Sequence, residues 1–517
     1  MKIVTAEEMR SLEGQSLRNG GSVDDLIDKA GFAVAQKARE FMGDIRGLQI
    51  LILVGSGNNG NDGLVAARYL ADWGSQVTIY LTSSRDESDH NISLLQAINV
   101  SILDIHEDVN LSELDGCLSR VTLVIDAILG TGKSRAMQTS LSSVLSKLIE
   151  ARRVRTTLKL LAVDMPSGLD ANSGEVDSFC PAADITVALG FPKVGMFVFP
   201  GASKIGRLEV SDIGLSPELS QSVMQELITP GLVREALPAR PMDAHKGSFG
   251  KVFVIAGSEK YVGAASLACQ AASRVGAGLV TLAVSKRVQS LLAEKLTETT
   301  YTPLPEDDGV IVHDAVDIIR YESVDSQSLL VGCGLGQETG VSQLIRRVLL
   351  GYQPNGIPLV LDAEALNILS TVPEWWLRIK DQAVLTPHPG EMARLVGLTP
   401  KVINADRVNI VRYWAHKWDK VIVLKGAYTV IGDPCGVVRV SPFANAVLAS
   451  AGTGDVLAGI IAGLLAQGLS AFDAAACAVY IHGTAGEMAS QEIGKVGVIA
   501  SDLLPRLPQA IKHLAPD

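Results

Sequence analysis

Short apolar runs alternate with amphipathic stretches along the chain, and this alternation predicts an α/β fold. In the first half, runs rich in Val, Ile, Leu and Ala predict buried strands at residues 48–54, 77–81, 123–128, 160–164 and 185–189. Helical patterns occupy residues 65–73 and 141–151, and two more helices precede the first strand, one starting after Thr5 and one over residues 23–41. Strands that alternate with helices are typical of a parallel sheet covered on both faces, as in Rossmann-like three-layer domains.

The same alternation starts afresh in the second half. Apolar runs predict strands at residues 251–256, 279–284, 328–331, 358–361, 383–385 and 421–425, with helices at 263–277, 456–465 and 471–488. The stretch between the halves, residues 215–243, is polar, carries Pro230, Pro238 and Pro241, and holds no long apolar run. We therefore expect two α/β domains, residues 1–225 and 226–517, with the boundary placed to within about ten residues.

The composition and net charge argue against several classes of protein. The chain has 517 residues, 47% of them hydrophobic and 5% aromatic, and a net charge of -11. That charge argues against nucleic acid as a partner, because binding a phosphate backbone demands an excess of Lys and Arg. The six cysteines form no C-x-x-C pair, and the longest apolar run, residues 456–465, is about half of what a bilayer requires. The sequence predicts a cytoplasmic protein without a membrane partner.

The most informative motif is the small-residue loop 449–455, which leads into the apolar run 456–465. Its glycines, Gly452 and Gly454, would let a phosphate approach the backbone at a helix N-terminus. Asp455 stands at the edge of this loop, where a carboxylate could take a proton from an attacking hydroxyl. The alternative is a glycine-rich turn before a buried helix.

A second glycine-rich loop, residues 55–63, follows the first predicted strand, and a helical pattern begins at Leu64. Strand, glycine loop and helix together form the phosphate-binding unit of doubly wound α/β proteins. An NAD-binding site of the usual redox type also needs a carboxylate after the next strand, but Thr82, Ser83 and Ser84 stand there. This sequence therefore disfavours a redox dinucleotide site.

Polar residues mark the carboxyl ends of other strands in the first half. Asp126 and Asp164 each end an apolar run, and Asn59 and Asp62 lie in the glycine loop. Ligands of open parallel sheets bind outside these strand ends, so the side chains should converge on one crevice. Asn59, Asp126 and Ser167 are hard oxygen donors that could either hold a monovalent cation or cap loops.

The stretch from Gly130 to Ser134 has the letters of the end of a Walker A loop. The leading glycine of that motif would fall at position 127, which is alanine. The sequence favours a glycine turn whose backbone N–H groups contact a phosphate.

Two loops of the second half follow strands and are expected to face the loop 449–455. His388 precedes Pro389 and Glu391, which suit the first turn of a helix, so His388 either points into the crevice or orders the loop. Lys425 and the small residues after it could hold nucleotide phosphates and admit an adenine ring. Mg²⁺ would arrive with the nucleotide.

These motifs together resemble one family. Residues 57–63 and 164–170 are similar to the NAD(P)H-hydrate epimerase domain. Lys246-Gly247, residues 261–264, 334–336 and 388–391, Lys425-Gly426 and residues 452–455 resemble the ribokinase-like NAD(P)H-hydrate dehydratase. In this order, over nearly the whole chain, they resemble the bifunctional NAD(P)H-hydrate repair enzymes.

The resemblance implies that the first domain interconverts the R and S epimers of hydrated NADH and NADPH. Asp164 would contact the ring and move a proton, and Asn59, Asp126 and Ser167 would hold K⁺. The expected substrate-binding residues are Asn58, Asn59, Gly60, Asn61, Asp62, Gly130, Thr131, Gly132, Lys133, Ser134, Arg135, Ala136 and Asp164.

For the second domain the resemblance implies dehydration of the S epimer with ADP, giving AMP and phosphate, with ATP as the alternative nucleotide and Mg²⁺ bound to it. Asp455 would deprotonate the C6 hydroxyl, which phosphorylation turns into a leaving group. Ala264, Gly334, His388 and Asp455 would bind the hydrate, and Lys425, Gly426, Ala427, Tyr428, Thr429 and Gly454 the nucleotide. We also expect a homo-oligomer.

Two other functions stay open at this point. Ribokinase-like folds host kinases of small alcohols, which would release a stable phosphorylated product. The first domain could also be a non-catalytic binding module, although its polar residues are all present.

Overall fold

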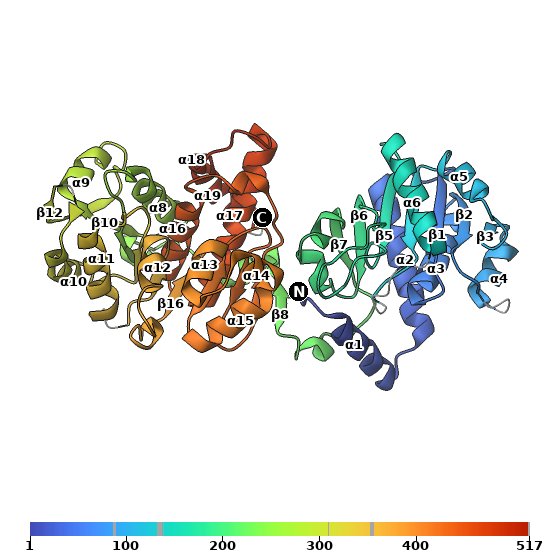
Figure 1. Ribbon diagram of the computed structural model, residues 1–517, viewed down its shortest axis with the longest axis horizontal. Coiled ribbons are helices and arrows are strands. Elements are labelled where there is room, and N and C mark those ends of the chain that lie inside the picture. The colour runs from blue at the N-terminus through green and yellow to red at the C-terminus, as the bar shows by residue number, and fades with distance from the viewer. Residues whose placement is uncertain (86–88, 132–136, 138, 309, 352–355, 515–517) are drawn as a thin grey trace. The chain divides into compact units, whose positions relative to one another are not determined.

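The structure, a computed structural model, describes residues 1–85, 89–131, 137, 139–308, 310–351 and 356–514. It divides into two compact units, Met1–Val223 and Met224–Asp517 (Figure 1). Each unit is built on its own large sheet.

The first unit holds a parallel sheet with the strand order β3-β2-β1-β4-β5-β6-β7. Its strands are β1 (Gln49–Val54), β2 (Gln76–Leu81), β3 (Ser101–Asp104), β4 (Leu123–Ala127), β5 (Lys159–Val163), β6 (Ile185–Leu189) and β7 (Arg207–Ser211). Its helices are α1 (Ala6–Arg18), α2 (Val23–Met42), α3 (Asn58–Asp72), α4 (His90–Ala97), α5 (Ser112–Leu118) and α6 (Thr139–Val154), with short turns of helix η1 (Val194–Phe197), η2 (Gly201–Ser203) and η3 (Pro217–Ser220).

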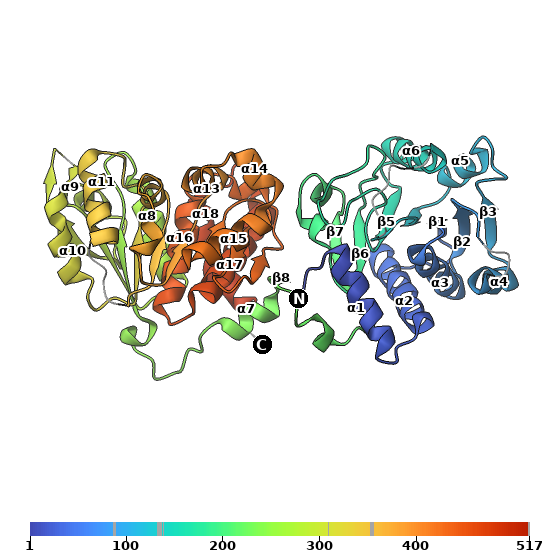
Figure 2. The same cartoon turned by 60° about the horizontal axis from the view of Figure 1, so that its bottom comes forward.

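Helices cover both faces of this sheet. Ile50 and Ile52 of β1 pack in one core with α2 and α3, whereas Leu51 and Leu53 pack on the opposite face with α5 and α6. Figure 2 shows α2 and α3 on one side of the strands and α5 and α6 on the other. The alternate side chains of a strand point to opposite faces, so a fully apolar strand requires both faces to be covered. The predicted three-layer, Rossmann-like fold is confirmed.

Helix α3 begins earlier than the sequence suggested. We expected a loop through residue 63 and a helix from Leu64, but the helix starts at Asn58. Its glycines serve close packing: a Cβ at Gly60 would lie 2.0 Å from the backbone oxygen of Gly55, and one at Gly63 would lie 2.5 Å from Cβ of Ala127. The glycines therefore let the helix approach the sheet rather than interrupt it.

The second unit holds a sheet with the order β11-β10-β9-β14-β15-β16-β17-β18-β19-β8. Its pairs are parallel except those that join β17, β18 and β19. The strands are β8 (Gln225–Leu227), β9 (Lys251–Ile255), β10 (Leu279–Ser285), β11 (Thr300–Leu304), β14 (Ser328–Val331), β15 (Leu359–Leu361), β16 (Ala383–Leu385), β17 (Val421–Leu424), β18 (Val430–Gly432) and β19 (Val438–Val440), and β12 (Glu306–Asp307) pairs with β13 (Val310–Ile311) as a separate ribbon.

The helices of this unit are α7 (Pro230–Ala236), α8 (Val262–Arg274), α9 (Lys286–Leu292), α10 (Val316–Glu322), α11 (Thr339–Arg346), α12 (Glu364–Leu369), α13 (Pro389–Val396), α14 (Pro400–Ala405), α15 (Arg407–Trp418), α16 (Thr453–Ala466), α17 (Ala471–Ile493), α18 (Ala500–Leu503) and α19 (Leu507–Lys512). Shorter turns are η4 (Lys246–Phe249), η5 (His313–Ala315), η6 (Arg347–Gly351), η7 (Trp375–Leu377), η8 (Ala446–Leu448) and η9 (Leu504–Arg506).

Helix α16 lies at the centre of the main core of the second unit. Its residues from Val456 to Ala466 are buried, and it packs with α8 and α17 against the strands. A helix that is apolar all round needs such enclosure. Two glycines make the approach to α8 possible, because a Cβ at Gly459 would lie 2.2 Å from the backbone oxygen of Ala268 and one at Gly463 would lie 2.7 Å from Val275.

Several short strands were not expected from the sequence. Strands β3 and β7 are mostly half-buried, and β8 lies within the polar stretch 215–243 together with α7. Strands at or near a sheet edge bury only part of their side chains, so they lack the continuous apolar run that marks a central strand.

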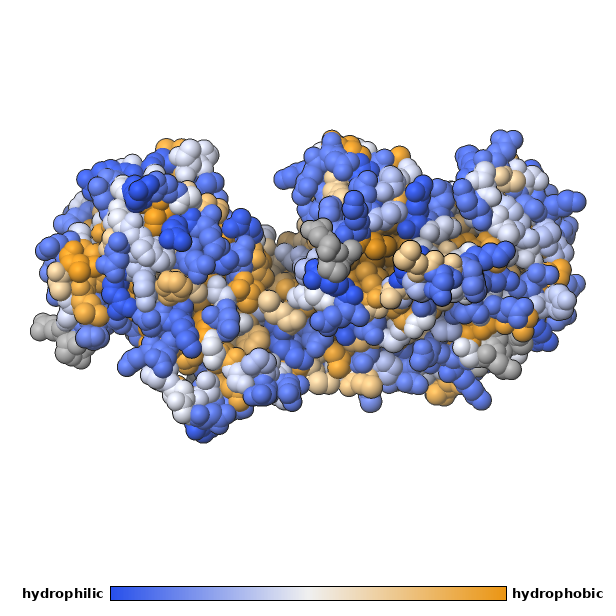
Figure 3. Space-filling view, turned by 180° about the vertical axis from the view of Figure 1, so that it is seen from behind, coloured by the Kyte–Doolittle hydropathy of each residue, from blue (hydrophilic) through white to orange (hydrophobic). Residues whose placement is uncertain are grey.

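On the face shown in Figure 3, hydrophilic residues are interspersed with small hydrophobic patches. None of the helices within the described ranges is both long enough and apolar enough to span a bilayer.

Candidate functional sites

The strand order of the first unit reverses between β1 and β4, so the ends of these strands form the topological switch point at which ligands of such sheets bind. The chain after β1 enters α3 with Asn58, Asn59, Gly60, Asn61 and Asp62. Gly130 and Thr131 follow β4, while Asp164 and Ser167 follow β5. The structure therefore brings the predicted residues that it describes to one edge of the sheet, whereas Gly132, Lys133, Ser134, Arg135 and Ala136 lie outside the described residues.

Asp126 and Ser167 form a buried pair at this edge. Oδ2 of Asp126 accepts the backbone N–H of Ser167 at 2.8 Å, and Oδ1 accepts the Ser167 hydroxyl at 2.6 Å. Asp126 lies within β4 opposite Leu53 of β1, inside the strand that the sequence predicts over residues 123–128. Burial raises the pKa of Asp126 against the effect of these hydrogen bonds.

Asn59 lies next to this pair. Its Nδ2 donates to the backbone oxygen of Leu129 at 3.1 Å, and the backbone N–H of Leu129 donates to Oγ of Ser167 at 3.0 Å. Oδ1 of Asn59 is buried and has no hydrogen-bond partner among the described residues. A buried amide oxygen without a donor is costly, and a bound cation would satisfy it. These oxygen donors therefore fit a hard monovalent cation.

Asp164 is held in an unusual conformation. Its φ of 62° lies in the left-handed region, which few residues other than glycine adopt and which is common at functional sites. Oδ1 of its side chain accepts the backbone N–H of Leu189 at 3.1 Å and also accepts Nζ of Lys193. Lys193 is fully buried and was not identified from the sequence, although it follows β6 as the other site residues follow their strands.

Two more carboxyl groups approach Asp164. Burial raises the pKa of Asp62 well above its usual range, and the charges of Asp164 and Glu13 raise it further. The pKa of Glu13, on α1, is also raised, chiefly by burial and then by Asp164. Perturbed carboxyl groups gathered around one lysine are typical of a site that moves protons.

The glycine loop is fixed by Arg85, another residue that the sequence did not reveal. Its Nη1 donates to the backbone oxygen of Gly55 at 2.6 Å, and its Nη2 donates to Oδ1 of Asn61. Asp89 accepts Nε at 3.0 Å. Arg85 thus orients the start of α3, where backbone N–H groups can bind an anion.

In the second unit, the loop 449–455 leads into α16. Gly452 is the N-cap with a φ of 90°, and Asp455 lies in the first turn of the helix. The helix therefore starts at Thr453, three residues before the apolar run from Val456 on which its prediction rests. The predicted anion loop lies on the N-terminal turn of a 14-residue helix, whose dipole favours negative charge.

Asp455 lies close to Cys333 and Asp362. One carboxylate oxygen from each aspartate and Sγ of Cys333 all lie within 4.8 Å of one another. Burial raises the pKa of Asp455 to about 6, and the charge of Asp362 adds to the effect. A carboxyl group that titrates near neutrality is suited to general-base work.

Lys425 follows β17 and faces this group. Its Nζ lies 2.7 Å from Oδ1 of Asp362, which also accepts the hydroxyl of Thr386 at 2.6 Å. A Cβ at Gly454 would lie 3.4 Å from the same Nζ, so Lys425 reaches the helix N-terminus. The sequence analysis does not identify Asp362, although this residue directly follows β15 and strand-end position is the signal that singled out Asp126 and Asp164.

Residues after Lys425 form a tight loop. Gly426 has a φ of 140° and accepts the hydroxyl of Thr429 at 2.8 Å with its backbone oxygen. Tyr428 has a φ of 51° and donates its backbone N–H to Phe443 at 2.8 Å. Ala427 lies between them, so this loop presents backbone next to Lys425.

His388 is the N-cap of α13. Its Nδ1 accepts the backbone N–H groups of Gly390 and Glu391 at 3.0 and 3.4 Å, so its ring orders the loop, and desolvation lowers its pKa. The side chain stays 51% exposed, and its Nε2 lies 3.5 Å from Oε1 of Glu391. Elsewhere in this unit, a Cβ at Gly334 would lie 2.7 Å from Cβ of Ala264, so these two predicted residues are neighbours.

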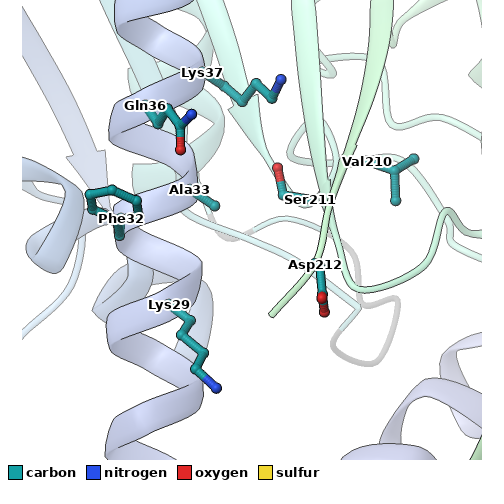
Figure 4. Close-up of a pocket in the computed structure, with 8 residues that line it drawn as sticks. All are labelled: Lys29, Phe32, Ala33, Gln36, Lys37, Val210, Ser211 and Asp212. Carbon is teal, nitrogen blue, oxygen red and sulfur yellow. The ribbon is translucent and has the colours of Figure 1, made fainter. Parts of the chain in front are cut away.

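A separate hollow in the first unit is lined by none of the site residues described above. It measures about 330 Å³ between α2 and β7 and is lined by Lys29, Phe32, Ala33, Gln36, Lys37, Val210, Ser211 and Asp212 (Figure 4). Of its polar side chains, only Ser211 is buried. The hollow therefore lacks the convergent polar groups of a catalytic site.

Two family models match the chain. One, described as YjeF-related protein N-terminus, matches residues 23–195, and one described as NAD(P)H-hydrate dehydratase matches residues 252–509. Together they account for most of both units.

Full-length relatives also match. A bifunctional NAD(P)H-hydrate repair enzyme Nnr from Moorella thermoacetica is 40% identical, covering 99% of this chain and 97% of its own. The enzyme of the same name from Escherichia coli is 32% identical over 95% of this chain and 90% of its own. Among solved structures, an ADP/ATP-dependent NAD(P)H-hydrate dehydratase from Bacillus subtilis, co-crystallized with ATP and Mg²⁺, is 33% identical and covers 56% of this chain and 99% of that chain, with a TM-score of 0.48.

Proposed function

The chain belongs to the family of bifunctional NAD(P)H-hydrate repair enzymes, and we propose that its two units divide the two reactions between them. The enzyme epimerises hydrated NADH and NADPH and dehydrates them back to the reduced cofactors. We assign epimerisation to residues 1–225 and dehydration to residues 226–517, which form the ribokinase-like half. The observation that carries this division is that each unit has its own group of perturbed carboxyl groups beside a helix N-terminus.

In the first unit, the hydrate would lie at the switch point of the sheet. Residues Asn58 to Asp62 on the first turns of α3, with residues 130–136, would hold it, and Asp164 would contact the nicotinamide ring. Epimerisation at C6 requires that the hydroxyl leave one face of the ring and return to the other. Asp164 is suited to move the proton because both hydrogen bonds that it accepts from described residues end on Oδ1, which leaves Oδ2 for the substrate.

Asn59, Asp126 and Ser167 would hold K⁺ beside this site. The support is the buried Oδ1 of Asn59, which lacks a donor among the described residues and lies next to the Asp126–Ser167 pair. A monovalent cation there would supply positive charge for the substrate's phosphates.

In the second unit, Asp455 would take the proton of the C6 hydroxyl of the S epimer. The hydroxyl oxygen then attacks the terminal phosphoryl group of ADP, and AMP leaves. The ring nitrogen's electron pair expels phosphate from C6, and loss of a proton from C5 restores the double bond of the reduced cofactor. The N–H groups at Gly452 to Gly454 would stabilise the charge of the moving phosphoryl group.

The nucleotide would bind with Lys425 near its phosphates and with Gly426, Ala427, Tyr428, Thr429 and Gly454 around it. Ala264, Gly334 and His388 would contact the hydrate. Mg²⁺ would bind together with the nucleotide, whose phosphate oxygens are ligands that it prefers. We propose ADP as the usual phosphoryl donor, with ATP as an alternative.

A direct test incubates a mixture of R and S hydrates with the enzyme, with and without ADP or ATP, and follows the absorbance of the reduced cofactor. With nucleotide, both epimers should be converted and AMP and phosphate should form from ADP. A stable phosphorylated hydrate would instead identify a small-alcohol kinase. The expected homo-oligomer and cytoplasmic location stay predictions, which light scattering and cell fractionation would test.

A further inference from the structure

The buried ammonium group of Lys193 is the feature of the first unit that the proposed roles leave unused. Its side chain is 0% exposed and comes from the segment after β6. Nζ contacts Oδ1 of Asp164 and the backbone oxygen of Leu189, the latter at 3.3 Å. A charge removed from water needs such a partner, so the position of Lys193 is set by Asp164.

The contact also fixes Asp164. Oδ1 is held between the Lys193 ammonium and the N–H of Leu189, while the backbone N–H of Asp164 donates to Val187 at 2.8 Å. With the backbone in the left-handed region, the carboxylate has one defined direction. The other oxygen, Oδ2, accepts no hydrogen bond from the described residues, and its direction is fixed together with that of Oδ1.

Other charged groups around this pair come from different elements. Glu13 lies on α1 with Arg10 near it, and Asp62 lies on α3. Lys193 stabilises the charged form of Asp62 only weakly, because burial and two neighbouring carboxylates oppose it. The lysine is thus ion-paired with Asp164, whereas Asp62, which is buried at 7% exposed on α3, forms no ion pair with a described residue, and this burial favours its neutral form.

On the premise that this unit epimerises NAD(P)H hydrates, we propose that Lys193 is a positioning residue that makes Asp164 the proton acceptor and leaves Asp62 as the proton donor. When the surroundings keep one carboxyl group protonated and its neighbour ionised, the two can act as acid and base in one reaction. Lys193 itself does not touch the reacting atoms and acts through Asp164.

Atoms and charge balance in this reaction. Asp62 donates its proton to the C6 hydroxyl, and the C6–O bond breaks with its electron pair leaving in water. The electron pair of the ring nitrogen forms a double bond to C6. Water then adds to the other face of C6, the double bond returns its electrons to nitrogen, and Asp164 takes the proton of the added water. Exchange with solvent returns a proton to Asp62 and removes one from Asp164.

The test measures epimerisation by the full-length Lys193→Gln variant without nucleotide, with chromatography separating the R and S hydrates. We expect kcat to fall by about 10²–10³, the usual effect of losing a correctly placed acid or base, while KM stays near that of the wild type. The acidic limb of the pH–rate profile should move to higher pH, because the acceptor has lost its counter-charge. The Lys193→Arg variant, which keeps the charge, should retain more activity than Lys193→Gln.

Two control experiments distinguish a positioning role of Lys193 from a role in folding. In the Asp164→Asn background, Lys193→Gln should cause little further loss, because its effect passes through Asp164. Lys37→Gln removes a lysine ion-paired with Glu40 and Glu209 in the same unit and should leave epimerisation unchanged. Nucleotide-dependent dehydration of pure S hydrate serves as the internal measure of intact enzyme.

If Lys193→Gln unfolds the first unit, Asp62→Asn tests the same acid and base pair, and it should lower kcat comparably and abolish the basic limb. Wild-type kcat and pH profile in either folded variant would overturn the inference. Failure of the wild type to interconvert the epimers would instead overturn the assignment of epimerisation to this unit.

Discussion

The Nζ of Lys425 lies 2.7 Å from Oδ1 of Asp362, beside the carboxylate of Asp455. The lysine that the sequence assigns to nucleotide phosphates is therefore also ion-paired with a carboxylate of the protein. Asp362 thus has two effects at the site: it holds Lys425 in place, and its charge helps to raise the pKa of Asp455.

Replacing Asp455 by asparagine should separate nucleotide binding from chemistry. Asp455→Asn keeps the shape of the first turn of α16 but cannot accept the hydroxyl proton. Dehydration of the S hydrate should fall by about two to four orders of magnitude, while ADP binding by calorimetry and R-to-S epimerisation persist. Near-normal dehydration by this variant would exclude Asp455 as the base.

Dehydration should also depend on pH through Asp455. Its pKa is raised to about 6, so the protonated, inactive form accumulates as the pH falls below about 6, and kcat/KM should decline there. Asp362→Asn removes a negative neighbour and frees Lys425, and both changes favour the ionised base. The pH at which kcat/KM declines should then be lower than in the wild type. If this pH does not change, a group other than Asp455 controls the decline.

Asp164→Asn should remove accelerated epimerisation and leave dehydration intact. A mixed pool of hydrates with ADP would then be converted in two phases, a fast one for the S epimer and a slow one at the spontaneous rate of epimerisation. The measurement is the time course of reduced-cofactor absorbance. A single fast phase that consumes both epimers would contradict the role of Asp164.

The close approach of α3 to the sheet predicts a stability effect. Gly60→Ala would place a Cβ 2.0 Å from the backbone oxygen of Gly55 and should destabilise the first unit by about 1–3 kcal/mol. A Cβ at Gly116 of α5 would meet no described atom within 4 Å, so Gly116→Ala should be neutral or stabilising. Thermal unfolding of the two variants compares them, and equal midpoints would show that α3 can shift freely.

The sequence predicted those parts of the fold that depend on continuous apolar runs. Central strands such as β1 and β17 and the buried helix α16 appear within a few residues of their expected positions. The glycine pattern predicts a loop at Gly60 and Gly63 and so places the start of helix α3 too late, whereas close packing requires glycine at both positions. Edge strands such as β3 are only partly buried, so their hydrophobic pattern is too weak to predict a strand.

The residues missed at the two sites share one property. Lys193, Glu13 and Asp362 each act through a partner that is distant in sequence, although Asp362 directly follows β15, as a strand-end carboxylate would. Lys193 could have been suspected, since it follows β6 as Asp164 follows β5. Glu13 could not, because an acidic residue on an amphipathic helix is usually solvated.

The central claim is that one chain carries two independent sites acting in sequence, and mixing two inactive variants tests it most directly. Asp164→Asn and Asp455→Asn, each full length, are incubated singly and together with pure R hydrate and ADP. Each alone should regenerate little reduced cofactor beyond the spontaneous rate, because one lacks epimerisation and the other lacks dehydration. The mixture should restore rapid conversion of the R hydrate, and a mixture no faster than its faster component would contradict the account.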